Sequence, residues 1–141
     1  MPLDFPGLVL DASALLALVL TDEEGGEVEE LTQDIIRRNG QLLVPPLFWY
    51  EVLNGLAAAC IRSRITQEEL SAIESDLSVL PVSVDQSPPV FVRQRIREYA
   101  LRYSLTVYDA AYVELAARYR LPLKTFDAHI LALKETFSFI R

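Results

Sequence analysis

The sequence has one cysteine, Cys60, and one histidine, His129. A lone cysteine excludes an intramolecular disulfide, so the fold does not depend on an oxidising compartment. With a single residue of each kind, neither a Ser-His-Asp triad nor a Cys-His pair is well supported. Any catalytic chemistry is therefore expected from other side chains.

Long apolar runs are missing as well. Residues 8–20 are rich in Leu, Val and Ala, but they contain Asp11 and are too few to cross a bilayer. The start, residues 1–4, lacks the positive charge that opens a secretory signal. We expect a cytoplasmic protein with no membrane partner.

What remains is the composition of a globular protein. The chain has 141 residues, of which 51% are hydrophobic and 23% charged, and it contains no repeat or low-complexity segment. At this length a folded chain buries well over half of its extended surface. We predict a single domain over residues 1–141.

Positive charge is scarce, and its distribution is uneven. The net charge is −7, with 14 acids and 4 bases in residues 1–76 but 6 acids and 9 bases in residues 77–141. Because nucleic-acid affinity depends on Lys and Arg that neutralise phosphates, the C-terminal half is the better candidate to face such a substrate. Four of its nine bases lie close together, namely Arg93, Arg95, Arg97 and Arg102, although a solvated helix face would explain these four equally well.

Short apolar segments alternate with helical ones along the chain, which is typical of a parallel sheet covered on both faces. In such sheets a ligand site lies beyond the carboxyl ends of the strands. Gly40 is predicted as a helix C-cap, and Thr66 with Glu69 as a capping box. We predict strands at 8–10, 42–44, 82–84 and 123–126 with an edge strand at 139–140, and helices at 12–20, around 28–35, 47–62, 66–79, 88–103, from 107 and from 128.

Four carboxylates, Asp11, Glu51, Asp109 and Asp127, stand alone in apolar sequence. Asp11 and Asp127 follow predicted strands, whereas Glu51 interrupts an apolar helix and Asp109 begins one. Removing a lone carboxylate from water is costly unless it is paired or bound to a cation. Only Asp127 has a base close in sequence, namely Lys124. We predict that the four acids meet at the edge of the sheet.

Carboxylates that meet need a counter-charge. Two of them about 5 Å apart repel by roughly 3 kcal/mol at an effective dielectric near 20, and Mg²⁺ or Mn²⁺ with oxygen ligands would relieve this repulsion. Three acids also have local explanations, because Asp11 and Asp127 can cap the following helices and Thr106 with Asp109 matches a capping box. Glu51 has the weakest such explanation. A shared metal site accounts for all four together.

The segments around these acids resemble a PIN domain, and more closely the VapC-type toxin ribonucleases. The matching segments are LVLDAS at 8–13, YEVLN at 50–54, LTVYDAAY at 105–112 and LPLKTFD at 121–127. Their order and spacing agree over nearly the whole chain. The resemblance implies a PIN-like three-layer α/β/α fold with a central parallel sheet of four to five strands, a Mg²⁺ or Mn²⁺ site and endonucleolytic cleavage of RNA.

The same resemblance implies roles for individual residues. Asp11 and Asp109 would be the most direct metal ligands, while Glu51 and Asp127 would complete the catalytic cluster directly or through water. Other polar groups would orient these acids or the substrate, namely Ser13, Asn54 and Thr125. The resemblance also implies a homodimer and a small antitoxin protein that blocks the site.

Two features depart from the family pattern. The N-terminal half is strongly acidic for an RNA-cutting surface, and His129, just after the fourth acid, is not part of the motif. We interpret His129 as a residue of the helix surface and not as a catalytic base. The tyrosines could stack RNA bases, but their spacing suits packing or a dimer interface better; they are Tyr99, Tyr103, Tyr108 and Tyr112.

In the predicted reaction the ion polarises the scissile phosphate and activates a water molecule, and the carboxylates hold the ion and accept the proton of the water. The main alternative is a PIN-like module that has kept the acids but binds RNA or protein with little or no catalytic turnover. Two others fit less well. A phosphatase of the haloacid dehalogenase type needs a second Asp where Ser13 stands, and a receiver domain needs paired acids near the first strand.

Overall fold

The computed structural model describes residues 6–20 and 25–141, so the interpretation of residues 1–4 lies outside the described residues. Four parallel strands form one sheet in the order β3-β2-β1-β4. Their bounds are Gly7–Leu10 for β1, Gln41–Val44 for β2, Val82–Val84 for β3 and Leu123–Lys124 for β4.

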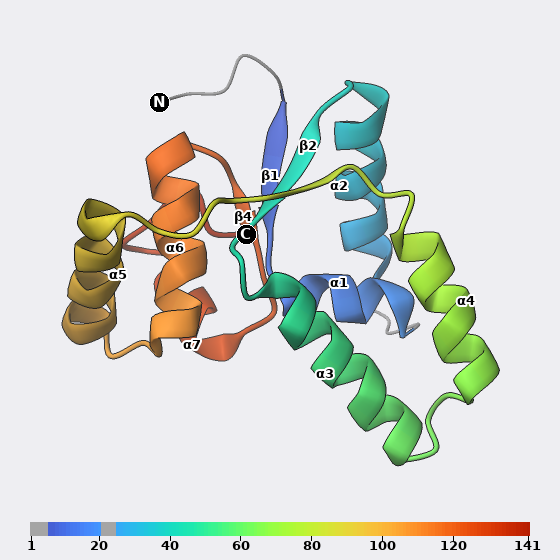
Figure 1. Ribbon diagram of the computed structural model, residues 1–141. Coiled ribbons are helices and arrows are strands. Elements are labelled where there is room, and N and C mark those ends of the chain that lie inside the picture. Colours follow the sequence, from blue (N-terminus) through green and yellow to red (C-terminus); the bar gives the residue numbers. More distant parts are fainter. Residues whose placement is uncertain (1–5, 21–24) are drawn as a thin grey trace.

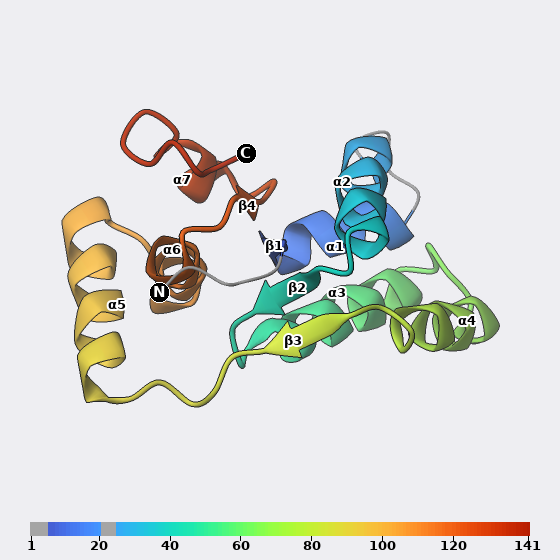
Figure 2. The ribbon, with the colours of Figure 1, turned by 90° about the horizontal axis from the view of Figure 1, so that it is seen from above.

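Helices cover both faces of this sheet, as Figures 1 and 2 show. α5 and α6 lie on one side, and α1, α2, α3 and α4 lie on the other. The predicted three-layer α/β/α fold is therefore confirmed. The bounds are Ala12–Val19 for α1, Gly25–Arg37 for α2, Phe48–Ile61 for α3, Gln67–Leu77 for α4, Val90–Tyr103 for α5, Val107–Tyr119 for α6 and Ala128–Leu131 for α7.

The central strands supply the middle of the core. All four residues of β1 are buried, and so are the last three of β2, because helices pack on both faces of the sheet. The largest fully buried side chains around them include Phe48, Leu56 and Tyr112. Within the described residues, no helix combines the length and apolar character that a bilayer crossing requires.

The C-terminal segment lies beside β4, at the sheet edge. The predicted edge strand at 139–140 is a single parallel bridge between Leu123 and Ile140. It is held by hydrogen bonds from Leu123 N to Phe139 O at 2.9 Å and from Arg141 N to Leu123 O at 2.8 Å. The predicted strand at 123–126 is shorter than expected and ends at Lys124, because the next residues leave the sheet for the acidic site.

Gly40 lies at the end of α2 as predicted, but it is not the left-handed residue of the helix cap. The left-handed residue at the end of α2 is Asn39, with φ 56°, and Gly40 does not have a positive φ. Gly40 N donates to Ile35 O at 2.8 Å and Asn39 N to Ile36 O at 3.0 Å, which is a Schellman motif. A Cβ on Gly40 would collide with the carbonyl oxygen of Pro6. Glycine is needed here for close packing of two backbone segments.

The capping box at the start of α4 is confirmed. Thr66 Oγ1 accepts from Glu69 N at 3.1 Å, and Glu69 Oε2 accepts from Thr66 N at 2.8 Å. The predicted helix start is therefore correct to one residue, because the local sequence itself satisfies the free N–H groups of the first turn.

Candidate active site

The four acids predicted from the sequence line one hollow of about 270 Å³. It lies at the carboxyl edge of the sheet, where α1, α3, α6 and α7 begin (Figure 1). Asp11 and Asp127 are the N-cap residues of α1 and α7, and Glu51 and Asp109 lie in the first turns of α3 and α6. The remaining lining residues are Ala12, Ser13, Leu16, Asn54 and Gly55.

Asp11 is the most enclosed of the four, with 5% of its surface exposed. Its Oδ2 accepts hydrogen bonds from Thr125 Oγ1 at 2.6 Å and from Ser13 Oγ at 2.8 Å. Although Asp11 is the N-cap of α1, its side chain makes no capping hydrogen bond. The local explanation of Asp11 as a side-chain cap is therefore wrong, and its carboxylate lines the hollow instead.

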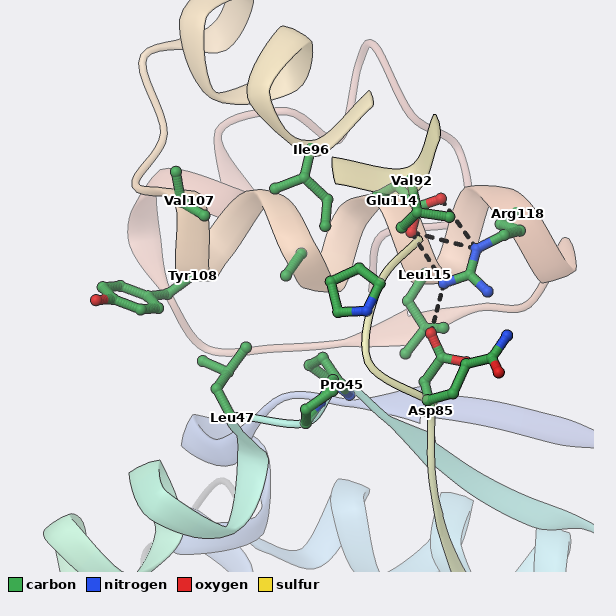
Figure 3. Close-up of a pocket in the computed structure, with 14 residues that line it drawn as sticks. Pro45, Leu47, Asp85, Val92, Ile96, Val107, Tyr108, Glu114, Leu115 and Arg118 are labelled. Atoms are coloured by element: carbon green, nitrogen blue, oxygen red, sulfur yellow. Dashed lines mark hydrogen bonds and ion pairs between the residues drawn. The ribbon is translucent and has the colours of Figure 1, made fainter. Parts of the chain in front are cut away.

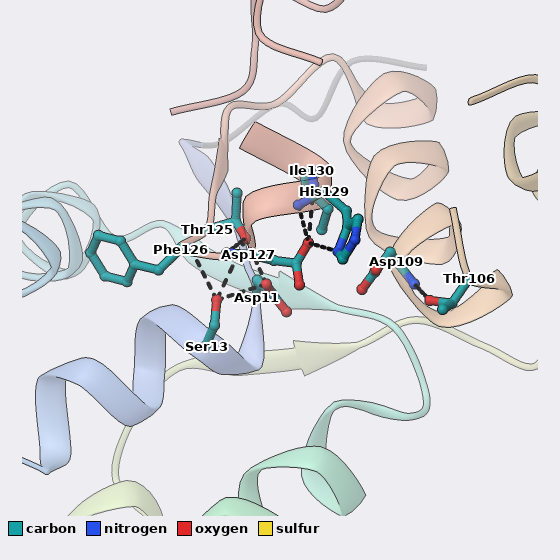
Figure 4. A network of polar contacts seen from close by, with 9 residues as sticks. All are labelled: Asp11, Ser13, Thr106, Asp109, Thr125, Phe126, Asp127, His129 and Ile130. Carbon is teal, nitrogen blue, oxygen red and sulfur yellow. Dashed lines mark hydrogen bonds and ion pairs between the residues drawn. The ribbon is translucent and has the colours of Figure 1, made fainter. Parts of the chain in front are cut away.

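The hydroxyls of Ser13 and Thr125 each donate one hydrogen bond and accept another (Figure 4). Ser13 Oγ accepts from Phe126 N at 3.0 Å, and Thr125 Oγ1 accepts from Asp127 N at 3.0 Å, while both hydroxyls donate to Asp11. The backbone that leads to Asp127 is thus tied to the carboxylate of Asp11. The structure places both hydroxyls where they orient the acids.

Glu51 is positioned by a tyrosine for which the sequence predicted packing or a dimer interface and no role in the site. Tyr112, from α6, is fully buried and donates its hydroxyl proton to Glu51 Oε1 at 2.7 Å. This contact joins α3 to α6, and it fixes a long carboxylate side chain that would otherwise have several rotamers. Base stacking by Tyr112 is excluded by its burial.

Asp109 and Asp127 face each other across the open side of the hollow (Figure 4). Thr106 Oγ1 accepts from Asp109 N at 3.1 Å, but the carboxylate of Asp109 does not complete a capping box as Glu69 does. Asp127 does cap α7, because its Oδ1 accepts from His129 N at 2.9 Å and from Ile130 N at 3.0 Å. Asp127 therefore combines a capping role with its place in the hollow.

No Lys or Arg among the described residues forms an ion pair with the four acids. The one basic partner is His129, whose Nδ1 lies 3.8 Å from Asp127 Oδ1. Lys124, although close to Asp127 in sequence, points away and pairs with Glu27 Oε2 on α2 at 3.0 Å. The cluster thus lacks a strong internal counter-charge in the part of the chain that the structure describes.

The pKa values reflect this crowding. Burial raises the pKa of Asp11, and the charge of Asp127 adds to it against the two hydroxyl hydrogen bonds. Burial also raises the pKa of Glu51, with Asp11 and Asp109 contributing, and it raises the pKa of Asp109 together with the charge of Asp127. Mutual repulsion of half-buried carboxylates is the condition that a bound cation relieves.

The donor set fits a hard divalent cation. Carboxylate oxygens are the ligands that Mg²⁺ and Mn²⁺ prefer, and a hollow that is open on one side leaves room for water and a phosphate oxygen. The atoms of Asp109, Asp127 and His129 that could bind an ion all lie within 4.8 Å of one another. The residues present therefore suit the group that the sequence resemblance implies.

The other tyrosines have structural surroundings of two kinds. Tyr99 and Tyr103 pack edge-on against Phe137, with ring centroids 5.7 and 5.2 Å away, as the packing interpretation predicted. Tyr108 is 63% exposed near the start of α6. Of the four tyrosines, only Tyr108 therefore has the exposure that contact with a nucleic-acid base requires.

A second hollow, of about 230 Å³, lies between α5, α6 and the segment after β2 (Figure 3). Its walls are mostly apolar, and at one end Arg118 binds Asp85 Oδ2 at 2.6 Å and Glu114 Oε1 at 3.0 Å. This ion network ties the segment after β3 to α6. None of the four acids predicted as site residues lines this hollow, and its charged residues are paired with one another.

The arginines predicted to face substrate lie on α5, next to α6. Arg93, Arg97 and Arg102 are exposed, and Arg95 is partly so. Arg102 is near the C-terminus of α5, at the end from which the chain turns into α6 and reaches Asp109. Figure 1 shows this end of α5 on the same side of the molecule as α7.

A family model described as "PIN domain" matches residues 8–135. The chain belongs to the PIN domain family, as the sequence resemblance predicted. The match includes all four acids and the strands and helices that carry them.

Two ribonucleases and one solved structure are similar to this chain over most of its length. The chain is 34% identical over 124 residues to Ribonuclease VapC12 of Mycobacterium tuberculosis, covering 87% of this chain and 88% of that protein. It is 30% identical over 123 residues to Ribonuclease VapC3 of Pyrobaculum aerophilum, covering 87% and 91%. Among solved structures, it is similar to the crystal structure of PAE2754 from Pyrobaculum aerophilum, with a TM-score of 0.63, 27% identity and coverage of 91% and 78%.

Proposed function

We propose that this protein is a metal-dependent endoribonuclease that hydrolyses RNA phosphodiester bonds and acts as the toxin of a toxin-antitoxin pair. The observation that carries the proposal is the meeting of four carboxylates in one hollow, from residues 11, 51, 109 and 127, which lie far apart in the sequence. The names of the relatives, Ribonuclease VapC12 and Ribonuclease VapC3, support the same activity. Membership of the PIN domain family is consistent with it.

Asp11 and Asp109 are proposed as the most direct ligands of Mg²⁺ or Mn²⁺, and Glu51 and Asp127 as the acids that complete the catalytic cluster by contacting the ion directly or through water. When bound, the cation supplies positive charge to the scissile phosphate and activates a water molecule. Ser13 and Thr125 hold Asp11 by its Oδ2 and so fix the direction in which this carboxylate faces the hollow. Asn54, exposed at the rim, is placed to contact substrate.

Proton transfer falls to the half-buried acids. The raised pKa values of Glu51 and Asp109 make these carboxylates better proton acceptors than ordinary surface acids. Tyr112 occupies Oε1 of Glu51, which leaves Oε2 as the oxygen that takes the proton of the attacking water. Glu51 lines the same hollow as Asp11 and Asp127, which suits this role.

The proposed partners follow from the same assignment. They are an RNA substrate, a small antitoxin protein that covers the site, and a second copy of the chain in a homodimer. We place the protein in the cytoplasm, where RNA and a newly made antitoxin are both present. The alternative function is a PIN domain that binds RNA or protein with little or no turnover.

Cleavage of a mixed RNA substrate separates these two functions. Addition of Mg²⁺ or Mn²⁺ should start cleavage, and EDTA should abolish it. Loss of a residue that only supports a metal ligand typically costs about 10–100-fold. Asp109 is proposed as a ligand itself, so Asp109→Asn should reduce the rate by more than about 100-fold. Asp76→Asn, at an exposed position on α4, is the matched control and should cleave normally.

A different set of results would reject the nuclease assignment. Cleavage that continues in EDTA, or that Asp109→Asn leaves unchanged, would show that the acids and the ion are not responsible. Tight RNA binding without cleavage at any concentration of either ion would favour the binding module.

A further inference from the structure

One nitrogen donor lies beside the acidic hollow, although the family motif does not include it. His129 is the only histidine of the chain, and it is the second residue of α7, two positions after Asp127. Its side chain is 77% exposed, and Figure 4 shows its ring beside Asp127 and directed toward Asp109. The imidazole ring makes no hydrogen bond with the described residues.

The backbone holds this imidazole close to two carboxylates. Asp127 Oδ1 accepts from the N–H of His129 itself, so the first turn of α7 is fixed relative to the acid. Nδ1 of His129 then lies 3.8 Å from Asp127 Oδ1, which is too long for a hydrogen bond. The candidate donor atoms of His129, Asp127 and Asp109 are all within 4.8 Å of one another.

These separations suit shared coordination. With ligand bonds near 2.1 Å, two donors of a six-coordinate ion lie about 3 Å apart when adjacent and about 4 Å apart when opposite. The 3.8 Å between Nδ1 and Oδ1 falls between these values, and small rotations of the side chains bring either arrangement within reach. An exposed imidazole makes such a rotation at little cost.

We propose that His129 is a nitrogen ligand of the divalent ion held by Asp109 and Asp127. The inference rests on the proposed metal-dependent function and adds to it a donor of a different chemistry. Imidazole nitrogen suits transition-metal ions, whereas Mg²⁺ prefers oxygen ligands and retains several waters. His129 therefore shifts the preference of the site from Mg²⁺ toward Mn²⁺.

The single histidine makes a direct test available. Tag-free protein is loaded with Mn²⁺ and studied by pulsed electron paramagnetic resonance, which detects a nitrogen bound to the ion. We expect a coupling to ¹⁴N that changes when the protein is made with ¹⁵N-labelled histidine. The coupling should vanish in His129→Gln, which keeps a polar side chain of moderate length and changes only an exposed position.

Binding titrations with each ion, without RNA, give a second readout. Because a lost ligand should cost at least about tenfold in affinity, the Kd for Mn²⁺ should rise by that factor in His129→Gln, and the Kd for Mg²⁺ should rise less. Ala128→Gln, at the neighbouring exposed position of α7, is the matched control and should keep both affinities and the nitrogen coupling.

The outcomes distinguish this proposal from the proposed function. Mn²⁺ that binds without nitrogen coupling, or affinities for the two ions that fall equally or not at all in His129→Gln, would overturn the role of His129 and leave the carboxylate site intact. Absence of any Mn²⁺ or Mg²⁺ binding would overturn the metal-dependent function itself, and the role of His129 with it.

Discussion

The hydroxyl of Tyr112 is the group through which the α6 helix controls an acid on α3. A charge-assisted hydrogen bond of this kind contributes about 1.5–3 kcal/mol, and here it also fixes a rotamer. Burial and the charge of Asp11 raise the pKa of the Tyr112 hydroxyl, so the hydroxyl keeps its proton and remains a donor. Because this hydroxyl is buried, it in turn depends on Glu51 as its acceptor. The buried donor and the half-buried acceptor thus satisfy each other.

Tyr112→Phe should therefore weaken metal binding without unfolding the protein. We expect the affinity for Mn²⁺, measured by calorimetry, to fall by about 10-fold, which corresponds to the lower end of the energy of such a hydrogen bond. Tyr103→Phe is the matched control, because Tyr103 packs against Phe137 by its ring. Equal Mn²⁺ affinities in the two variants would show that Glu51 is held without this hydroxyl.

Crowding of the acids gives the metal-free protein a pH dependence. The pKa values of Asp11, Glu51 and Asp109 are raised above ordinary values of 3.8, 4.5 and 3.8, so the folded state holds protons that the unfolded state releases. Their stabilising contribution is complete below those ordinary values, and it is lost as pH rises through the folded-state values.

Asp109→Asn should consequently be more stable than the natural chain in EDTA at about pH 7.5 and equally stable at about pH 4. We expect a difference of about 1 kcal/mol at the higher pH, the scale of one pair of like charges near a surface. Urea unfolding in EDTA measures it. A difference that is the same at both pH values would mean that repulsion among the acids is not its source.

Single residues also show what the sequence could and could not predict about the site. The four carboxylates were recognisable because each stands alone in apolar sequence, and capping accounts for three of them singly but not for all four together. Tyr112 was not, because a tyrosine among Ala and Val on a helix is typical of core, and its partner lies 61 residues away. Lys124 is close to Asp127 in sequence but pairs with Glu27 on α2, a partner that the local sequence does not reveal.

At the scale of elements, the helices and strands followed from periodicity and capping residues, with most bounds correct to within two residues. The exceptions lie where tertiary contacts decide. β4 ends early because Thr125 turns toward Asp11, and α7 is a single turn whose N-terminus is capped by Asp127. A local sequence pattern contains no information about such a distant partner.

Gly40 lies between α2 and β2, where it packs closely against the backbone of Pro6. In Gly40→Ala the new Cβ would meet the carbonyl oxygen of Pro6, which is backbone and cannot move aside, so the junction between α2 and β2 must shift. We expect a loss of about 1–3 kcal/mol in the free energy of unfolding, measured by urea denaturation. The hydrogen bonds at the end of α2 also hold position 40 in place, because the N–H of Gly40 closes the Schellman motif.

Gly26→Ala is the matched control on the same helix, because a Cβ there would meet nothing within 4 Å. It should be neutral or slightly stabilising, since alanine favours helix over glycine. Equal losses in both variants would indicate that helix propensity, and not the close approach to Pro6, sets the requirement at position 40.

For the molecule as a whole, the uneven charge separates two surfaces. The acidic half carries α2 and α4, and the arginines cluster on α5, beside the helix that bears Asp109. If the exposed arginines contact RNA phosphates, each contact releases counterions and adds about one unit to the salt dependence of binding.

Arg97→Gln and Arg102→Gln should each weaken RNA binding and reduce the slope of log affinity against log salt by about one. Binding is best measured with an Asp109→Asn background, which prevents cleavage of the RNA. Arg38→Gln on the acidic side, where Arg38 pairs with Asp34, is the control and should leave the slope unchanged. Unchanged slopes in the α5 variants would assign these arginines to a solvated helix face.

The parallel order of the sheet also determines when during synthesis the protein acquires a working centre. β4 is the last of the four strands to leave the ribosome, yet it lies beside β1, the first. A nascent chain that ends before β4 carries Asp11, Glu51 and Asp109 but has neither Asp127 nor the Thr125 hydroxyl that orients Asp11. Translation of most of the message therefore proceeds before the product can attack any transcript, its own included.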